Sequence, residues 1–154
     1  MHKSFSAETG LALRVGGLMA LAVLVVAAAA GANELPAFKK GNWSFERTVE
    51  DPAHPGTPQT ITNQKCTDPT ADLKRQNAKL TQIGCRFSAV EKDGNRYTFI
   101  ARCRMQDRSG NTTNGQNTTV ITVESDSAYS LTVDGEVNGV ATHKKLAAKR
   151  LGNC

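Results

Sequence analysis

Short segments in which apolar and polar residues alternate recur along the chain from residue 41 onward, and turn-forming residues separate them. A period of two is the pattern of a strand whose two faces meet different surroundings, so each segment predicts a strand. Seven strands are expected, over residues 41–50, 60–66, 86–91, 96–105, 118–124, 129–136 and 140–151. The pattern therefore predicts a mainly β protein built on a curved antiparallel sheet, either a meander or a half-open barrel.

One segment between these strands has a helical pattern instead. Asp68 and Pro69 are typical of an N-cap followed by proline in the first helical turn, and Leu73 and Leu80 fall on one face. We expect one short helix that ends near Leu80. The polar stretch 108–117 is rich in Asn, Thr and Gly and is expected to be a loop.

Two dipeptides predict tight hairpins, Asp93-Gly94 and Asn138-Gly139. With three residues in the first loop, Cys85 lies opposite Cys103 and Ala89 lies opposite Phe99. This register favours a disulfide between Cys85 and Cys103, which leaves Cys66 to pair with Cys154. The rival scheme joins Cys66 to Cys85 across the helix and Cys103 to Cys154, and spacing alone leaves both schemes open.

The first 32 residues have the features of an export signal. Lys3 and Arg14 precede the uncharged run 15–32, which ends in the small-x-small pattern Ala30-Gly31-Ala32. The mature protein is therefore expected to be one domain over residues 33–154. The alternative is an uncleaved membrane anchor, although the run is rich in Ala and Gly rather than in Leu and Ile.

The expected destination is the periplasm. No cysteine lies near the cut to accept lipid, and a lone Arg14 is not a twin-arginine signal, so the general export route is predicted. All four cysteines follow the cut, and an even number of cysteines in an oxidising compartment predicts two disulfides. The net charge of +5 is small for a nucleic-acid binder, so no nucleic-acid partner is expected.

Several short motifs carry a resemblance to a known family. They are Gly41-x-Trp43, Gln64-x-Cys66 before the helix, Gly84-Cys85, a third cysteine that closes the hairpin, and Lys149-Arg150-Leu151-Gly152-Asn153-Cys154. In these positions the chain resembles an exported bacterial family catalogued as domain of unknown function 3617. The resemblance implies an exported, disulfide-bonded domain in a Gram-negative bacterium and implies no activity. Family members are rich in Met in the late strands, whereas Met105 alone follows residue 33 here, so a soft-metal role does not carry over.

No residue pattern predicts a reaction, a metal or a cofactor. The cysteine spacings give no Cys-x-x-Cys, and His54 and His143 have no partner at ligand spacing. Asp68 and Asp72 are expected to be first-turn helix acids rather than a catalytic pair. Trp43 could stack on a ligand, but its place on an alternating strand favours the core.

Four arginines are the candidate binding residues: Arg86, Arg96, Arg102 and Arg104. They share one face of the predicted hairpin, where guanidinium groups could bind an anionic envelope lipid or polysaccharide. The plainer interpretation is a solvated face with acidic neighbours. The sequence thus favours an exported, non-catalytic binding or structural module, with a periplasmic protein as another candidate partner. A periplasmic enzyme of an unrecognised type is the alternative.

Overall fold

The computed structural model describes residues 34–49, 56–106 and 109–154. The predicted signal segment, Glu50, His54 and Arg108 therefore lie outside the described residues. Within those ranges the chain forms eight strands and one helix. They are β1 (Gly41–Val49), β2 (Gln59–Thr67), α1 (Pro69–Gln82), β3 (Cys85–Phe87), β4 (Glu91–Asp93), β5 (Arg96–Gln106), β6 (Thr112–Ser125), β7 (Ala128–Val137) and β8 (Val140–Gly152).

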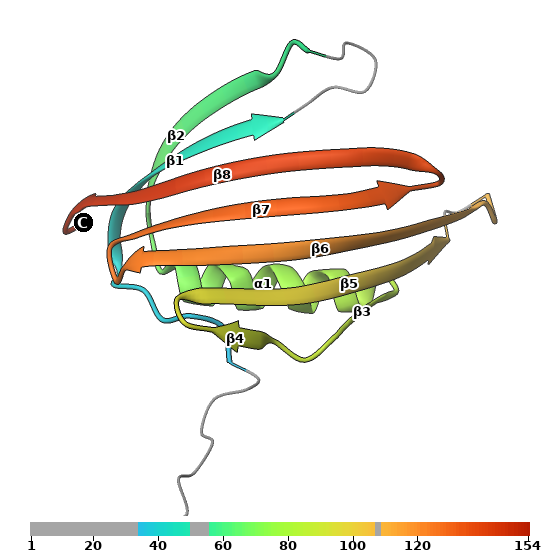
Figure 1. Cartoon of the computed structure of the whole chain (residues 1–154), viewed down its shortest axis with the longest axis horizontal. Helices are drawn as coiled ribbons and strands as arrows, with labels where there is room; N and C mark the ends of the chain where they lie inside the picture. Colours follow the sequence, from blue (N-terminus) through green and yellow to red (C-terminus); the bar gives the residue numbers. More distant parts are fainter. Residues whose placement is uncertain (1–33, 50–55, 107–108) are drawn as a thin grey trace, which may run out of the picture.

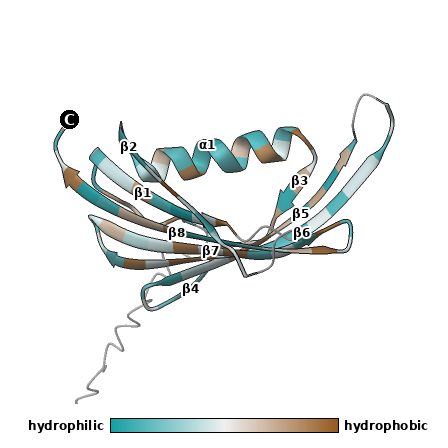
Figure 2. Cartoon of the chain, turned by 90° about the horizontal axis from the view of Figure 1, so that it is seen from above, coloured by the Kyte–Doolittle hydropathy of each residue, from teal (hydrophilic) through white to brown (hydrophobic). Residues whose placement is uncertain are grey.

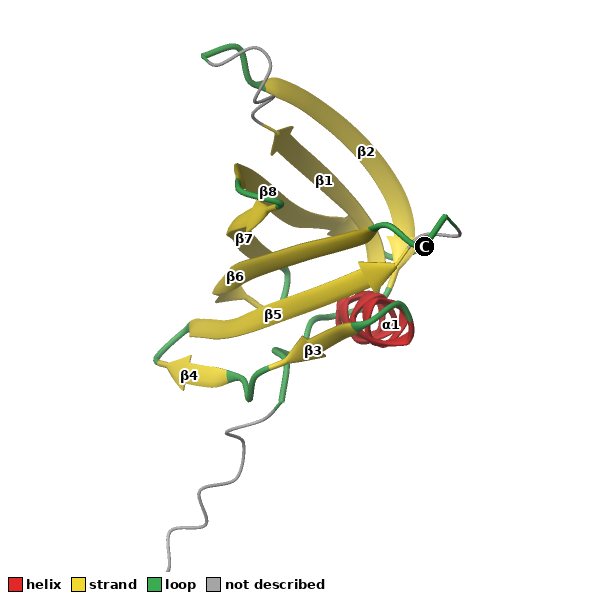
Figure 3. Cartoon of the chain, turned by 90° about the vertical axis from the view of Figure 1, so that its right-hand side faces the viewer, coloured by secondary structure: helices red, strands yellow, loops and turns green. Residues whose placement is uncertain are grey.

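All eight strands belong to one antiparallel sheet with the order β2-β1-β8-β7-β6-β5-β3, and β4 pairs with β5 (Figure 1). The strands β5 to β8 form a meander, and β8, the last strand, also pairs with β1, the first. The sheet is open and strongly curved, and α1 lies across its hollow side (Figure 2). Seen from the side, β1 and β2 rise away from α1 (Figure 3). The predicted mainly β fold with one helix is confirmed.

The hairpin between β7 and β8 follows directly from its turn residues. Val137 pairs with Val140, so Asn138 and Gly139 form a two-residue loop. Both have positive φ, 49° and 83°, as a type I′ turn requires. Asn and Gly tolerate this conformation at little steric cost, which explains why the dipeptide predicted the turn correctly.

The predicted strand 86–91 is wrong, because it is broken into β3 and β4. Cys85 does lie opposite Cys103, but Glu91 lies opposite Thr98, so the register shifts by one residue between the two short strands. Ser88 marks the break: its N–H donates to the Ile100 carbonyl, and its hydroxyl accepts from the Ile100 N–H. Ala89 is therefore not opposite Phe99.

The loop of this hairpin also differs from the prediction. Asp93 pairs with Arg96, so Gly94 and Asn95 form a two-residue loop instead of a three-residue one. The extra residue of the predicted register is taken up at the break between β3 and β4. This division of one predicted strand gives eight strands where seven were expected.

The polar stretch expected as a loop is in large part a strand. β6 begins at Thr112 and pairs with β5 from Gln106 onward. Its β-branched threonines favour extended backbone, and this end of the strand has no buried residue before Thr119. A strand that meets solvent on both faces lacks the apolar alternation on which the prediction depended.

The core lies toward one end of the sheet, on the face that α1 covers. Trp43 is fully buried there among Phe99, Ile121 and Tyr129. Phe38, from the segment before β1, stacks on Tyr129 with ring centroids 4.4 Å apart. The indole Nε1 of Trp43 donates to the Lys39 carbonyl at 3.0 Å, so its polar group is satisfied. The prediction that Trp43 is a core residue is confirmed.

Candidate ligand-binding groove

Each strand that flanks α1 in the sequence carries a disulfide-bonded cysteine. Cys66, near the end of β2, is bonded to Cys154, and Cys85, just after α1, is bonded to Cys103 in β5. The predicted pairing is confirmed, and the rival pairing is wrong. Of the residues in α1, Pro69 is the one that is buried. Disulfides thus constrain the chain on both sides of α1, while most of the helix surface stays unburied.

The first turn of α1 is ordered by two acidic residues, as predicted. The Asp68 carboxylate accepts from the Ala71 N–H at 3.0 Å and caps the helix. Asp72 forms an ion pair with Lys65 of β2 at 2.7 Å and accepts from the Thr67 hydroxyl at 2.6 Å. These contacts tie the start of the helix to the strand that leads into it.

The electrostatics of Asp72 reflect these partners. Partial burial acts to raise the pKa of its carboxyl, but the hydrogen bonds from Lys65 and Thr67, with the charges of Lys65 and Arg75, outweigh that effect. The pKa therefore lies below its ordinary value, and Asp72 is a carboxylate whose charge is already matched.

A groove of about 540 Å³ lies between α1 and the hollow face of the sheet. That volume falls within the range of about 300–1,000 Å³ that is typical of small-molecule sites. Apolar side chains from the sheet and from the underside of α1 make up much of its lining: Phe45, Phe87, Phe99, Ala101, Leu131, Val133, Leu146, Leu73 and Leu80. Leu73 and Leu80, the two predicted same-face leucines, both line it.

At its inner end the groove reaches Tyr129, which is 3% exposed. Burial, with a smaller contribution from the charge of Asp72, raises the pKa of Tyr129 to about 12. The phenol therefore stays protonated near neutral pH and can act as a hydrogen-bond donor.

The charged side chains of the groove are mostly basic. Arg47, Lys65, Lys144 and Lys145 line it, against one acid, Asp72. Lys65 is neutralised by Asp72, whereas Arg47 and Lys144 have no carboxylate partner among the described residues. Strand alternation puts Lys144 on the same face as Leu146 and puts Lys145 on the opposite face. The groove is therefore apolar along its floor and basic near Arg47 and Lys144.

The four predicted arginines lie on the outer face of the sheet, away from the groove. Arg86 is directly opposite Arg102, and Arg104 follows two residues along β5. Arg96 is six residues from Arg102 on the same strand, which is roughly 20 Å. The shared face is as predicted, but the four side chains do not converge on one point.

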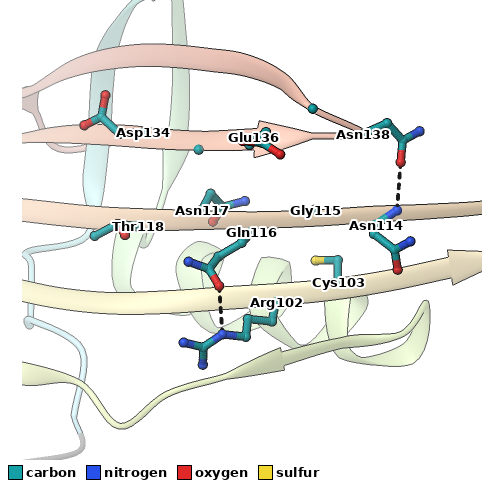
Figure 4. A pocket seen from close by; sticks show the side chains of 12 residues that line it. Arg102, Cys103, Asn114, Gly115, Gln116, Asn117, Thr118, Asp134, Glu136 and Asn138 are labelled. Atoms are coloured by element: carbon teal, nitrogen blue, oxygen red, sulfur yellow. Dashed lines mark hydrogen bonds between the residues drawn. The ribbon is translucent and has the colours of Figure 1, made fainter.

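Of the four arginines, Arg102 lies beside an amide and shares an open hollow with two acidic residues. Arg102 Nε donates to the Gln116 side-chain oxygen at 2.8 Å, as Figure 4 shows. Asp134 and Glu136 line the same open hollow of about 700 Å³. This mixture of charges matches the solvated strand face that was the plainer interpretation.

Comparison with known proteins identifies the family. The family model described as Protein of unknown function (DUF3617) matches residues 38–154, from the segment before β1 to the last cysteine. The chain belongs to the DUF3617 family. No curated protein and no solved structure matches it.

The described part of this DUF3617 protein contains no candidate metal centre. Residues 34–49, 56–106 and 109–154 contain no group of three or more His, Cys, Asp or Glu side chains that could hold a metal ion. His143 Nδ1 is hydrogen-bonded to the Asp134 carboxylate, and all four cysteines are in disulfides. The same residues contain no helix with the length and apolar character needed to cross a bilayer.

The sequence prediction missed the groove of this DUF3617 domain, although it contains a usable signal. On β1 the inward positions are Trp43, Phe45 and then Arg47, and on β8 they are Ala148, Leu146 and then Lys144. A basic residue at a position where alternation calls for an apolar one marks the place where a core face becomes an open surface. Two basic residues at such inward positions on paired strands indicate a binding site.

Proposed function

We propose that this domain is an exported, non-catalytic binding protein that holds an apolar small molecule in the groove between α1 and the sheet. One observation carries the proposal: a groove of about 540 Å³ lies beneath the helix, and apolar side chains make up about half of its lining. A helix that packs on a sheet ordinarily fills the space between them, because protein interiors are close-packed. Here the groove has the volume of a small-molecule site, and its apolar side chains favour a ligand with an apolar part.

The two disulfides support the same proposal. They join the flanks of α1 to the end of the chain and to β5, so α1 does not need close packing against the sheet to stay in position. A site that is held open before the ligand arrives reduces the ordering penalty of binding.

The residues that line the groove favour binding over catalysis. Asp72 is the one carboxylate among them, and it is already paired with Lys65 at 2.7 Å. The lining therefore has no second carboxylate and no histidine or cysteine to act together with Asp72.

Export to the periplasm is part of the proposal. It is supported by the apolar run that ends at Ala32 and by two disulfides, which persist in oxidising compartments. Intact-mass analysis of the periplasmic fraction should find a chain that starts at Asn33. A membrane-bound protein that retains residues 1–32 would instead support the anchor.

Fluorescence titration with the neutral apolar dye N-phenylnaphthylamine tests the binding function. We expect saturable enhancement of the dye emission by the purified exported protein. Leu80→Gln replaces an apolar wall of the groove by a polar side chain and should weaken dye binding about tenfold, since burying a leucine is worth about 1.5–3 kcal/mol.

Ile83→Gln is the matched control for this experiment. Ile83 follows α1, is 55% exposed and does not line the groove, so its replacement should leave dye affinity unchanged. Absence of saturable binding, or equal weakening by Leu80→Gln and Ile83→Gln, would overturn the proposed function.

A further inference from the structure

The groove changes character along its length, and the change follows the strands. Arg47 pairs with Leu146 across β1 and β8, and Lys144 is the next inward residue on β8. Lys144 also pairs with Val133 of β7. Arg47 and Lys144, which have no carboxylate partner among the described residues, are therefore diagonal neighbours on paired strands, at the end of the groove away from the aromatic core.

We propose that the groove takes a single-chain amphiphile with an anionic headgroup, which lies against Arg47 and Lys144 while the chain lies under α1. This inference rests on the proposed binding function. The apolar floor extends from Tyr129 to Val133 along β7, roughly 14 Å. A narrow apolar strip that ends in two cations matches a chain with a negative end.

The charge balance of the groove supports an anion rather than a neutral or cationic head. Asp72, its one acid, is neutralised by Lys65 and Arg75 and is not available to hold a cationic ligand. Arg47 and Lys144 carry like charges on paired strands, and an anion between them would offset their repulsion. Charge-assisted hydrogen bonds from a guanidinium to a carboxylate or phosphate are frequently bidentate, which would also fix the orientation of the ligand.

Two lysines on β8 provide a built-in comparison. Lys144 and Lys149 carry the same charge and are both exposed, but Lys144 lines the groove, whereas Lys149 does not line it and is placed on the opposite face by alternation. If Lys144 contacts a bound headgroup, its neutralisation should weaken anion binding, whereas neutralisation of Lys149 should not. A general effect of net charge would act through both equally.

The experiment measures displacement of N-phenylnaphthylamine from the exported protein by four amphiphiles with the same chain, each below the concentration at which it forms micelles. They are palmitate, hexadecyl phosphate, hexadecanol and hexadecyltrimethylammonium. The two anions should bind at least about tenfold more tightly than hexadecanol, since hydrogen bonds to charged groups contribute about 1.5–3 kcal/mol. The cation should bind most weakly. The ranking of palmitate against hexadecyl phosphate identifies which anionic head is preferred.

Variants then locate the headgroup. Arg47→Gln combined with Lys144→Gln should abolish the preference for anions over hexadecanol. Lys149→Gln should keep the preference. Equal displacement by palmitate, hexadecyl phosphate and hexadecanol in the wild type, or equal losses in Lys144→Gln and Lys149→Gln, would overturn the headgroup assignment but not the groove. Failure of the dye itself to bind would refute the groove function.

Discussion

The two disulfides should differ sharply in how easily they are reduced in the folded protein. Reduction requires a thiolate to reach a disulfide sulfur. Cys66 and Cys154 are both exposed, whereas Cys85 is 1% exposed and its partner Cys103 is half-buried. We therefore expect a mild reductant to open the Cys66–Cys154 bond first and to leave the Cys85–Cys103 bond intact until the domain unfolds.

The loss of stability can be estimated from the loops that the bonds close. The Cys66–Cys154 bond spans 88 residues and the Cys85–Cys103 bond spans 18. In the chain-entropy model these separations correspond to about 4.6 and about 3.2 kcal/mol of unfolding free energy. Because small domains unfold with about 5–15 kcal/mol in total, opening the longer loop should remove a large share of the stability.

Alkylation under native conditions, followed by peptide mapping, measures the order of reduction. Urea denaturation of a Cys66→Ala and Cys154→Ala double variant measures the stability, and Cys85→Ala with Cys103→Ala is the comparison. The first variant should lose about 4–5 kcal/mol of unfolding free energy. Equal alkylation rates at Cys66 and Cys85 would refute the accessibility argument, and a loss under about 1 kcal/mol would refute the loop argument.

Three further outcomes are expected. Asp72→Asn should lower stability near neutral pH. The pKa of Asp72 is lower in the folded protein than in the unfolded chain, so the carboxylate stabilises the fold above its unfolded-state pKa, and this contribution is lost as the pH falls through the folded-state pKa. Urea denaturation of variant and wild type should therefore converge at acid pH. Gly84→Ala should lower the free energy of unfolding in urea by more than about 2 kcal/mol, because φ is +103° and the new Cβ would lie 2.3 Å from the Arg104 carbonyl oxygen. The control Gly94→Ala, at φ of +57° with no atom within 4 Å of the new Cβ, should lower it by about 1 kcal/mol. If the predicted outer anion-binding surface exists, Arg102→Gln with Arg104→Gln should elute from heparin resin at lower salt; unchanged elution would leave these arginines as ordinary solvated residues.

The features that the sequence predicted well are those that local chemistry decides. Asp is favoured at an N-cap and proline at the first helical position, as Asp68 and Pro69 show, and Asn138-Gly139 has the residues that a type I′ turn requires. The Cys85–Cys103 pair was also predictable, because the part of the hairpin register nearest β3 is correct even though the loop length is not.

The features that were missed depend on partners distant in the sequence. The break after Phe87 arises because Ser88 satisfies both backbone groups of Ile100, which no pattern within residues 86–91 reveals. The beginning of β6 at Thr112 depends on the unpaired edge that β5 offers to it. The groove exists because α1 lies over the sheet without filling the space beneath, and strand periodicity contains no information about that distance.

The limited packing of α1 on the sheet and the groove beneath it have a common physical cause. An isolated helix of 14 residues is marginal in water, and Pro69 is its one buried residue, although Leu73 packs against the core from a half-buried position. The Asp72–Lys65 ion pair and the Cys66–Cys154 and Cys85–Cys103 bonds add to this limited packing, so the space under Leu80 need not be filled for the helix to keep its place. Filling that space with larger apolar residues would anchor the helix without disulfides but would remove the proposed site. It follows that ligand binding, as proposed, requires an oxidised protein, which agrees with the proposed export because disulfides persist in oxidising compartments.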